Sequence, residues 1–112
     1  RQMSETDGLD VSGSNLLIDN NSFSGFSDKA LSIGEKSNVV LVNNFVEKSN
    51  IGAAVKDGSS ACFSNNKFQS NATDITSYVK KTMYTYPDVK LANDQIIDNN
   101  IEYARLDTCD DF

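Results

Sequence analysis

The chain has 112 residues, 38% of them hydrophobic, with a formal net charge of −6 and no histidine. This length fits one domain, and no apolar run reaches the roughly 20 residues that a membrane-spanning helix needs. The acidic balance argues against nucleic acid as a partner, because phosphate binding requires a basic face. Histidine is the commonest general base and transition-metal ligand, so its absence leads us to expect no cofactor and no metal site.

Short alternating segments recur along the first two thirds of the chain. Their first apolar members are spaced by 22 residues, at Leu9, Leu31, Ala53 and Ile75, and each is followed two residues later by Val11, Ile33, Val55 and Ser77. Alternation of this kind is typical of a half-buried β-strand. The residues between them are predicted to face outward: Asp10, Ser32, Ala54 and Thr76. Turns rich in Gly, Ser and Asp follow each segment.

A pair of asparagines follows each of four short apolar runs. The first members, at positions 20, 43, 65 and 99, recur after 23, 22 and 34 residues. A period near 22 with short strands indicates a stacked solenoid. Equivalent residues of neighbouring coils lie about 4.8 Å apart, so their amides can form a hydrogen-bonded ladder. We predict that Asn20, Asn43, Asn65 and Asn99 form a structural ladder along one corner, with Asn43 and Asn65 buried.

The apolar runs before the asparagines are predicted to be second strands, and a third short strand follows with Phe23, Val46 and Phe68 inward. The second strands place two columns inward: Leu16/Val39/Ala61/Gln95 and Ile18/Leu41/Phe63/Ile97. The middle residues then form an outward apolar stripe: Leu17, Val40, Cys62 and Ile96. Such a stripe is usually covered. The tail of the chain, a neighbouring domain of the same protein, or a partner chain such as a second copy would each cover it.

The last asparagine pair arrives 12 residues late, which predicts an inserted loop over 78–91. It holds the only proline and a cluster of aromatic and basic residues: Tyr78, Lys80, Lys81, Tyr84 and Tyr86. Long insertions in repeat proteins map to surface loops, often on a binding face. Tyrosine rings stack on sugars while ammonium groups pair with carboxylates, which suits an acidic sugar or a peptide. Alternatively, the loop covers the open end of the solenoid.

Segments 28–37, 50–57 and 74–81 resemble repeats of right-handed parallel β-helices of the pectate-lyase-like superfamily. The likeness covers roughly residues 7–103 and is closest to short β-helix ends of exported or surface-associated bacterial proteins. It implies an all-β solenoid of about four coils with a 22-residue period and asparagine-lined corners. Leucine-rich and ankyrin repeats fit less well, because the Leu-x-x-Leu-x-Leu scaffold and helical periodicity are missing.

The sequence therefore predicts one β-helix domain over residues 1–112, with coils at about 7–103, a loop at 78–91 and a tail at 104–112. We expect it to be the C-terminal end of a longer protein that is extracellular or on the cell surface. The expected function is structural or adhesive. The alternative is a carbohydrate-binding or carbohydrate-active module that uses the Tyr/Lys loop to bind a polysaccharide.

Autonomous catalysis is not expected, and no catalytic residue is assigned. In enzymes of the superfamily the chemistry lies on the outer face of the first sheet, and the matching positions here offer a single carboxylate, Asp10. A glycosidase needs two carboxylates, and a lyase needs a base with a neutralising cation. Glu35 and Asp57 lie at adjacent turns and are expected to approach each other, as a solvated acidic face.

Two cysteines, Cys62 and Cys109, allow one disulfide. If the apolar tail folds back across the outward stripe, Cys109 approaches Cys62 and the two can bond. The competing interpretation is two free thiols on a disordered acidic tail.

Overall fold

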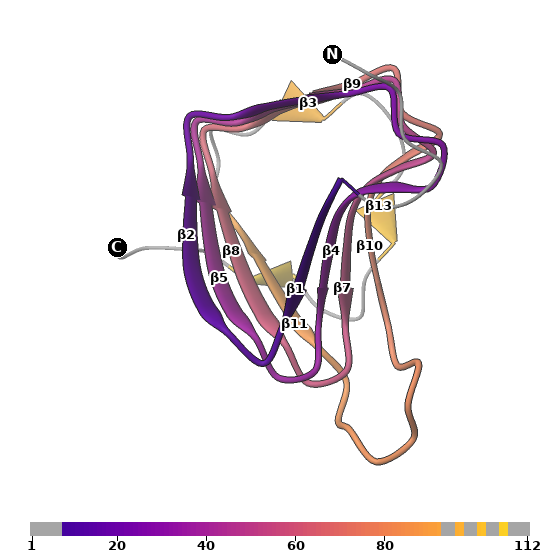
Figure 1. The fold of residues 1–112 in the computed structure, drawn as a ribbon. Coiled ribbons are helices and arrows are strands. Elements are labelled where there is room, and N and C mark those ends of the chain that lie inside the picture. The colour runs from indigo at the N-terminus through magenta and orange to yellow at the C-terminus, as the bar shows by residue number, and fades with distance from the viewer. Residues whose placement is uncertain (1–7, 93–95, 98–100, 103–105, 108–112) are drawn as a thin grey trace.

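The computed structural model describes residues 8–92, 96–97, 101–102 and 106–107. All regular elements in these ranges are β-strands, arranged in three parallel sheets. Figure 1 shows the sheets as three walls around one interior, with successive coils stacked behind one another. The described residues contain no helix long and apolar enough to cross a membrane.

Each coil contributes one strand to each sheet. The first sheet has the order β1 (Leu9–Ser12), β4 (Lys29–Gly34), β7 (Ile51–Lys56), β10 (Thr73–Tyr78) and β13 (Ile101–Glu102). The second has β14 (Leu106–Asp107), β11 (Asp88–Leu91), β8 (Ser60–Ser64), β5 (Asn38–Val42) and β2 (Asn15–Asp19). The third has β12 (Ile96–Ile97), β9 (Lys67–Gln69), β6 (Phe45–Glu47) and β3 (Ser22–Ser24).

The register of the first sheet confirms the predicted 22-residue period. Leu9 pairs with Leu31, Leu31 with Ala53, and Ala53 with Ile75. The predicted core is also confirmed, because four side chains from adjoining coils have no exposed surface: Ile33, Leu41, Val55 and Phe63. Phe63 and Phe68 join the second and third walls, with ring centroids 6.0 Å apart. Burial of these aliphatic and aromatic side chains is the main source of stability.

The fourth coil departs from the prediction in its second strand. β11 pairs with β8, so Val89 aligns with Ala61 and Leu91 with Phe63. Residues 88–91 are therefore a strand, and the insertion is confined to residues 79–87. The residues predicted for that strand belong instead to the third sheet, where Ile97 pairs with Phe68. Val89 and Leu91 alternate inward and pack against the core, which is why this segment takes the position.

The outer residues of the first sheet are less accessible than predicted. Asp10 is exposed. Ser32 and Ala54 have no exposed surface and Thr76 only 8%, although Ala54 does not belong to the core cluster. Small side chains in the middle of a sheet, such as these, are easily covered. Three of the four positions that were predicted to face outward on this sheet are thus buried.

The 79–87 loop projects away from the corner between the first and second sheets (Figure 1, orange). It does not cover the end of the solenoid, because β13 and β14 pair with the edges of β10 and β11. The capping interpretation of the loop is therefore wrong. β14 also shows that the sheet continues past residue 103, where the coils were predicted to end, and that Leu106 extends the second sheet. The rest of the predicted tail fold-back lies outside the described residues.

Candidate functional site

A buried asparagine ladder lines the corner between the second and third sheets. Asn44 and Asn66 are 3% and 2% exposed. The Oδ1 of Asn66 accepts the backbone N–H of Asn44 at 2.9 Å, and the Oδ1 of Asn44 accepts that of Asn21 at 2.9 Å. Their Nδ2 groups donate to carbonyls one coil back, Asn44 to Ile18 and Asn66 to Leu41. The buried ladder is therefore formed by the second asparagine of each pair, whereas we predicted that the first would be buried.

The first asparagines turn the chain. Asn20, Asn43 and Asn65 have φ of 60°, 59° and 55°, the left-handed region that asparagine tolerates better than most residues. All three are exposed, so the predicted burial of Asn43 and Asn65 is wrong. The predicted bond between them exists, from Asn65 Nδ2 to Asn43 Oδ1 at 2.6 Å. Asn99 lies outside the described residues.

A serine ladder lines the corner between the first and second sheets. Ser37 Oγ accepts the backbone N–H of Ser14 at 3.1 Å, and Ser59 Oγ accepts that of Ser37 at 3.1 Å. Sequence analysis missed this ladder, although the 23- and 22-residue spacing of these serines marks it. At the remaining corner, Ser49 N–H donates to Asn71 Oδ1 at 3.0 Å.

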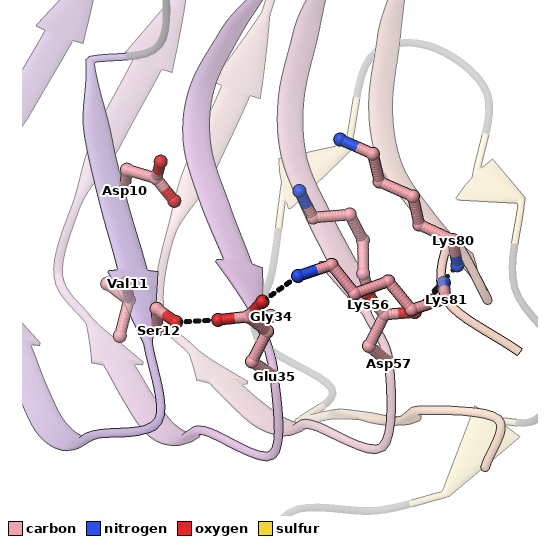
Figure 2. A pocket seen from close by; sticks show the side chains of 9 residues that line it. All are labelled: Asp10, Val11, Ser12, Gly34, Glu35, Lys56, Asp57, Lys80 and Lys81. Atoms are coloured by element: carbon pink, nitrogen blue, oxygen red, sulfur yellow. Dashed lines mark hydrogen bonds and ion pairs between the residues drawn. The ribbon is translucent and has the colours of Figure 1, made fainter. Parts of the chain in front are cut away.

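A polar groove lies at the carboxyl ends of the first-sheet strands, beside the departure point of the 79–87 loop (Figure 2). Its lining residues come from four neighbouring coils: Asp10, Val11, Ser12, Gly34, Glu35, Lys56, Asp57, Lys80 and Lys81. Two of the predicted ligand-binding residues, Lys80 and Lys81, are among them. We call this the corner groove.

Asp57 anchors the loop from beneath the corner groove. Its side chain is 2% exposed, and its Oδ1 accepts the backbone N–H groups of Lys80 at 2.6 Å and Lys81 at 2.9 Å. The insertion removes these two backbone N–H groups from the hydrogen bonds of the sheet, and the carboxylate accepts them instead. Asp57 is thus a structural residue that fixes the start of the loop.

Glu35 and Lys81 form an ion pair across the corner groove, and Ser12 Oγ donates to the same carboxylate (Figure 2). The hydrogen bond from Lys81, reinforced by that from Ser12, lowers the pKa of Glu35. The hydrogen bond to Glu35, together with the charge of that carboxylate, raises the pKa of Lys81. Glu35 and Asp57, which we expected to approach each other as a solvated face, each bind other groups of this corner.

Two further ammonium groups border the corner groove. Lys56 ends β7, and Lys80 follows β10, whose Tyr78 pairs with Lys56. Figure 2 shows both side chains rising from the same end of the sheet, with Asp10 farther along on β1. The corner groove thus carries the ammonium groups of Lys56, Lys80 and Lys81 beside the carboxylates of Asp10, Glu35 and Asp57.

The predicted tyrosines do not line the corner groove. Tyr86 is 51% exposed and donates its hydroxyl to the carbonyl of Ser77 at 3.2 Å. Tyr84 is half-buried, and its backbone N–H closes a turn onto the Lys81 carbonyl at 3.0 Å. Tyr78 is half-buried at the end of β10. The structure thus places Tyr84 and Tyr86 outside the corner groove, although Tyr84 bonds to the Lys81 backbone and acts electrostatically on the Lys81 ammonium group.

The outward apolar stripe lies on the second sheet, with one change of member. Leu17 aligns with Val40, Val40 with Cys62, and Cys62 with Lys90, which takes the place predicted for Ile96. Leu17 is 61% exposed, and the stripe borders a shallow apolar hollow. Cys62 is not a free thiol. Cys109 lies outside the described residues, so their predicted bond remains a prediction.

Residues 3–109 match the family model of the right-handed β-helix region. The chain therefore belongs to this family. Searches of curated proteins and of solved structures found no significant match. Among the described residues, no group of three or more His, Cys, Asp or Glu side chains is placed to hold a metal ion.

Proposed function

We propose that this right-handed β-helix chain is a structural and adhesive module of an exported or surface-associated protein, and that it performs no catalysis of its own. One observation carries this proposal: two of the three acids that line the corner groove are already engaged within the fold, which leaves a single exposed carboxylate there, Asp10. Asp57 is buried on two backbone N–H groups, and Glu35 is bound by Lys81 and Ser12. A glycosidase must hold two carboxylates across the scissile bond, one of them free to transfer a proton.

The corner ladders support the structural part of the proposal. At each corner, side-chain oxygens accept backbone N–H groups that the turn takes out of the sheets, as Asn66 does for Asn44. Satisfied buried polar networks rigidify a core. A solenoid fixed in this way holds its outer walls as stable surfaces. The exposed Leu17, with Val40 and Cys62 beside it, supports the adhesive part, because exposed apolar patches mark interaction sites.

The catalytic part is tested by incubating the protein with a panel of neutral and uronic-acid polysaccharides. We expect neither new reducing ends nor the ultraviolet absorbance of an unsaturated uronate. Turnover that Glu35→Gln abolishes while the melting temperature holds would overturn the proposal. Adhesion is tested with protein-coated beads under flow over immobilised polysaccharides and proteins. Beads carrying Leu17→Ser/Val40→Ser should detach at lower shear than parent beads, and equal detachment would reject adhesion through this wall.

A second function, binding of acidic polysaccharide, is favoured by the ammonium groups of Lys56 and Lys80 at the corner groove. Lysine pairs with a carboxylate as a point charge, and such contacts weaken with salt. Binding of oligogalacturonate in a titration should fall at least several-fold in Lys80→Ala and as salt is raised. Lys67→Ala on the third sheet is the matched control. Equal binding by Lys80→Ala and the parent would reject polysaccharide binding as a function of this groove.

The tyrosines of the 79–87 loop need a separate variant, because they lie outside the corner groove. If the loop contributes a stacking platform, Tyr84→Ala/Tyr86→Ala should abolish binding on a glycan array while the melting temperature changes little. If the two rings only brace the loop, the melting temperature should fall and binding should persist. The hydrogen bond from Tyr86 to Ser77 makes some loss of loop order expected in either case.

A further inference from the structure

The ion pair between Glu35 and Lys81 joins the ends of two strands that are not neighbours. Glu35 directly follows β4, and Lys81 lies three residues after β10, in the 79–87 loop. β7 lies between these two strands in the first sheet. Strands of a sheet are about 4.8 Å apart, so the pair spans about 10 Å along the corner groove. Figure 2 shows the Lys81 side chain crossing the end of β7 toward Glu35.

The Glu35 carboxylate receives hydrogen bonds from two other coils. Lys81 Nζ donates to Glu35 Oε2, and Ser12 Oγ, from the preceding coil, donates to Oε1. An ammonium group and a hydroxyl placed on the two oxygens of one carboxylate are also suitable donors for the carboxylate of a ligand. Glu35 therefore fills, from within the chain, a position that a ligand carboxylate can take.

The pair is accessible to solvent, unlike the other engaged acid of the corner groove. The side chains of Lys81 and Glu35 are 47% and 34% exposed. An exposed ion pair contributes little to stability, so an external carboxylate can displace Glu35 at small cost. Asp57 is 2% exposed and holds the start of the loop through two backbone N–H groups. Of these two acids, Glu35 is thus the displaceable one.

Two further ammonium groups lie beside the displaceable carboxylate. Lys56 ends β7, between the two members of the pair, and Lys80 directly precedes Lys81. The hydrogen bond from Lys81 is the largest cause of the lowered pKa of Glu35, and the charge of Lys56 acts in the same direction. Glu35 therefore offsets part of the positive charge on which the binding of an acidic polysaccharide depends.

We propose that Glu35 is an internal competitor for acidic polysaccharide, which displaces it and takes over the hydrogen bonds of Lys81 and Ser12. This inference rests on the second function, polysaccharide binding at the corner groove. A group tethered beside its partner acts at an effective concentration of about millimolar. A single sugar carboxylate therefore competes poorly, whereas a polymer that also pairs with Lys56 and Lys80 displaces Glu35. The competitor thus makes the groove selective for polymers over single sugars.

Removal of the competitor tests this role. In a titration with oligogalacturonate at low ionic strength, Glu35→Gln should bind about two- to fivefold more tightly than the parent, because an exposed ion pair no longer has to be broken. Glu47→Gln is the matched control, since Glu47 on the third sheet also accepts a serine hydroxyl, that of Ser24 at 3.1 Å. The control should bind like the parent. No gain in Glu35→Gln, or an equal gain in the control, would overturn the proposal.

A double-mutant cycle separates competition for Lys81 from simple repulsion between Glu35 and the ligand. Lys81→Gln leaves the start of the loop in place, because Asp57 holds it through backbone groups. All these variants change exposed side chains, so the melting temperature should stay within about 2 °C of the parent. In the Lys81→Gln background, Glu35→Gln should change the affinity by less than about 1.5-fold. The same gain with and without Lys81 would show repulsion and overturn the proposal.

The choice of ligands separates a failure of this inference from a failure of polysaccharide binding. Methyl-esterified oligogalacturonate has the same sugars without the charge, and monomeric galacturonate has one carboxylate. We expect the parent to bind neither measurably. Binding of the free oligomer by the parent, with no gain in Glu35→Gln, would reject the competitor and leave the second function standing. No binding of the oligomer by either protein, or equal binding of its esterified form, would reject both.

The monomer carries the selectivity part of the proposal. Its affinity for Glu35→Gln should rise above that for the parent, because the tethered carboxylate no longer competes with it. The ratio of oligomer affinity to monomer affinity should therefore be larger in the parent than in Glu35→Gln. An equal ratio in the two proteins would show that Glu35 does not select for polymers.

Discussion

Asn66 Oδ1 accepts two hydrogen bonds from Asn44, one from the backbone N–H at 2.9 Å and one from the side-chain Nδ2 at 3.0 Å. This oxygen is the interior acceptor of the corner, because both residues are almost fully buried. At this corner, one backbone N–H of each coil thus donates to the asparagine Oδ1 of the next coil. Stability at this corner depends on every member being present.

Asn66→Ala removes that acceptor and leaves the Asn44 N–H and the Leu41 carbonyl without their partners. A buried unsatisfied backbone group costs about 1–3 kcal/mol, so we expect a loss of at least that size in the free energy of unfolding. Urea denaturation followed by circular dichroism measures it. An unchanged midpoint would show that the ladder does not stabilise the fold.

The matched control lies one residue earlier in the neighbouring coil. Asn43 is exposed with φ of 59°, so Asn43→Gly should be nearly neutral. Asn43→Ala should cost about 1–2 kcal/mol through the strained backbone alone. At position 43, glycine should therefore destabilise the protein less than alanine. A buried ladder member would show the reverse order.

Phe63→Ala tests the inward assignment of the second strand. Phe63 has no exposed surface and packs against Phe68. Truncating a buried phenylalanine costs about 3–5 kcal/mol, which should be visible as a large drop in melting temperature. Leu17→Ala on the outer side of the same sheet should stay within about 0.5 kcal/mol of the parent. Similar losses in the two variants would contradict the alternation.

Sequence reasoning located the coils because their apolar period depends on local alternation alone. Leu9, Leu31, Ala53 and Ile75 align as their spacing predicts. It misplaced the asparagine ladder by one residue, since both members of each pair are polar and only backbone geometry decides which one points inward. Asn43 takes the left-handed turn, and this directs Asn44 into the core.

The fourth coil was misplaced for a related reason. Asn99-Asn100 repeats the pattern of the corners, and the apolar run before it was therefore taken as the second strand. The alternation of Val89 and Leu91 after Pro87 was the better indicator, and the structure uses it. The corner groove was only partly foreseeable, because Glu35 and Lys81 are 46 residues apart in sequence and meet only through the insertion.

The ion pair of Glu35 with Lys81 predicts a defined pH dependence. The pKa of Glu35 is lowered in the folded state. The stabilisation from this ion pair is therefore present above the ordinary glutamate pKa and is lost as pH falls through the lowered value. A carboxyl-detected NMR titration should find Glu35 titrating below the exposed glutamates. In Lys81→Gln its pKa should rise toward the ordinary value, because the largest cause of the shift is removed. An unchanged titration would show that the pair does not persist in solution.

Cys62 gives the last prediction, that it bonds to Cys109. Cys62 lies half-buried on the second sheet and is not a free thiol. Cys109 is the only other cysteine of the chain. A bond between them closes a loop of about 47 residues, which in the chain-entropy estimate stabilises the fold by about 4 kcal/mol. Disulfides persist in oxidising compartments, so this bond would agree with the export that we propose.

Alkylation under denaturing conditions, with and without reductant, checks this bond. We expect no labelling of the protein purified from an oxidising compartment until reductant is added, and labelling of both cysteines afterwards. Non-reducing peptide mapping should recover the fragments around residues 62 and 109 joined. Cys62→Ser and Cys109→Ser should lower the melting temperature by the same amount, and the double variant by no more than either, because all three remove one bond. Unequal single variants, or labelling before reduction, would show that the two thiols are independent.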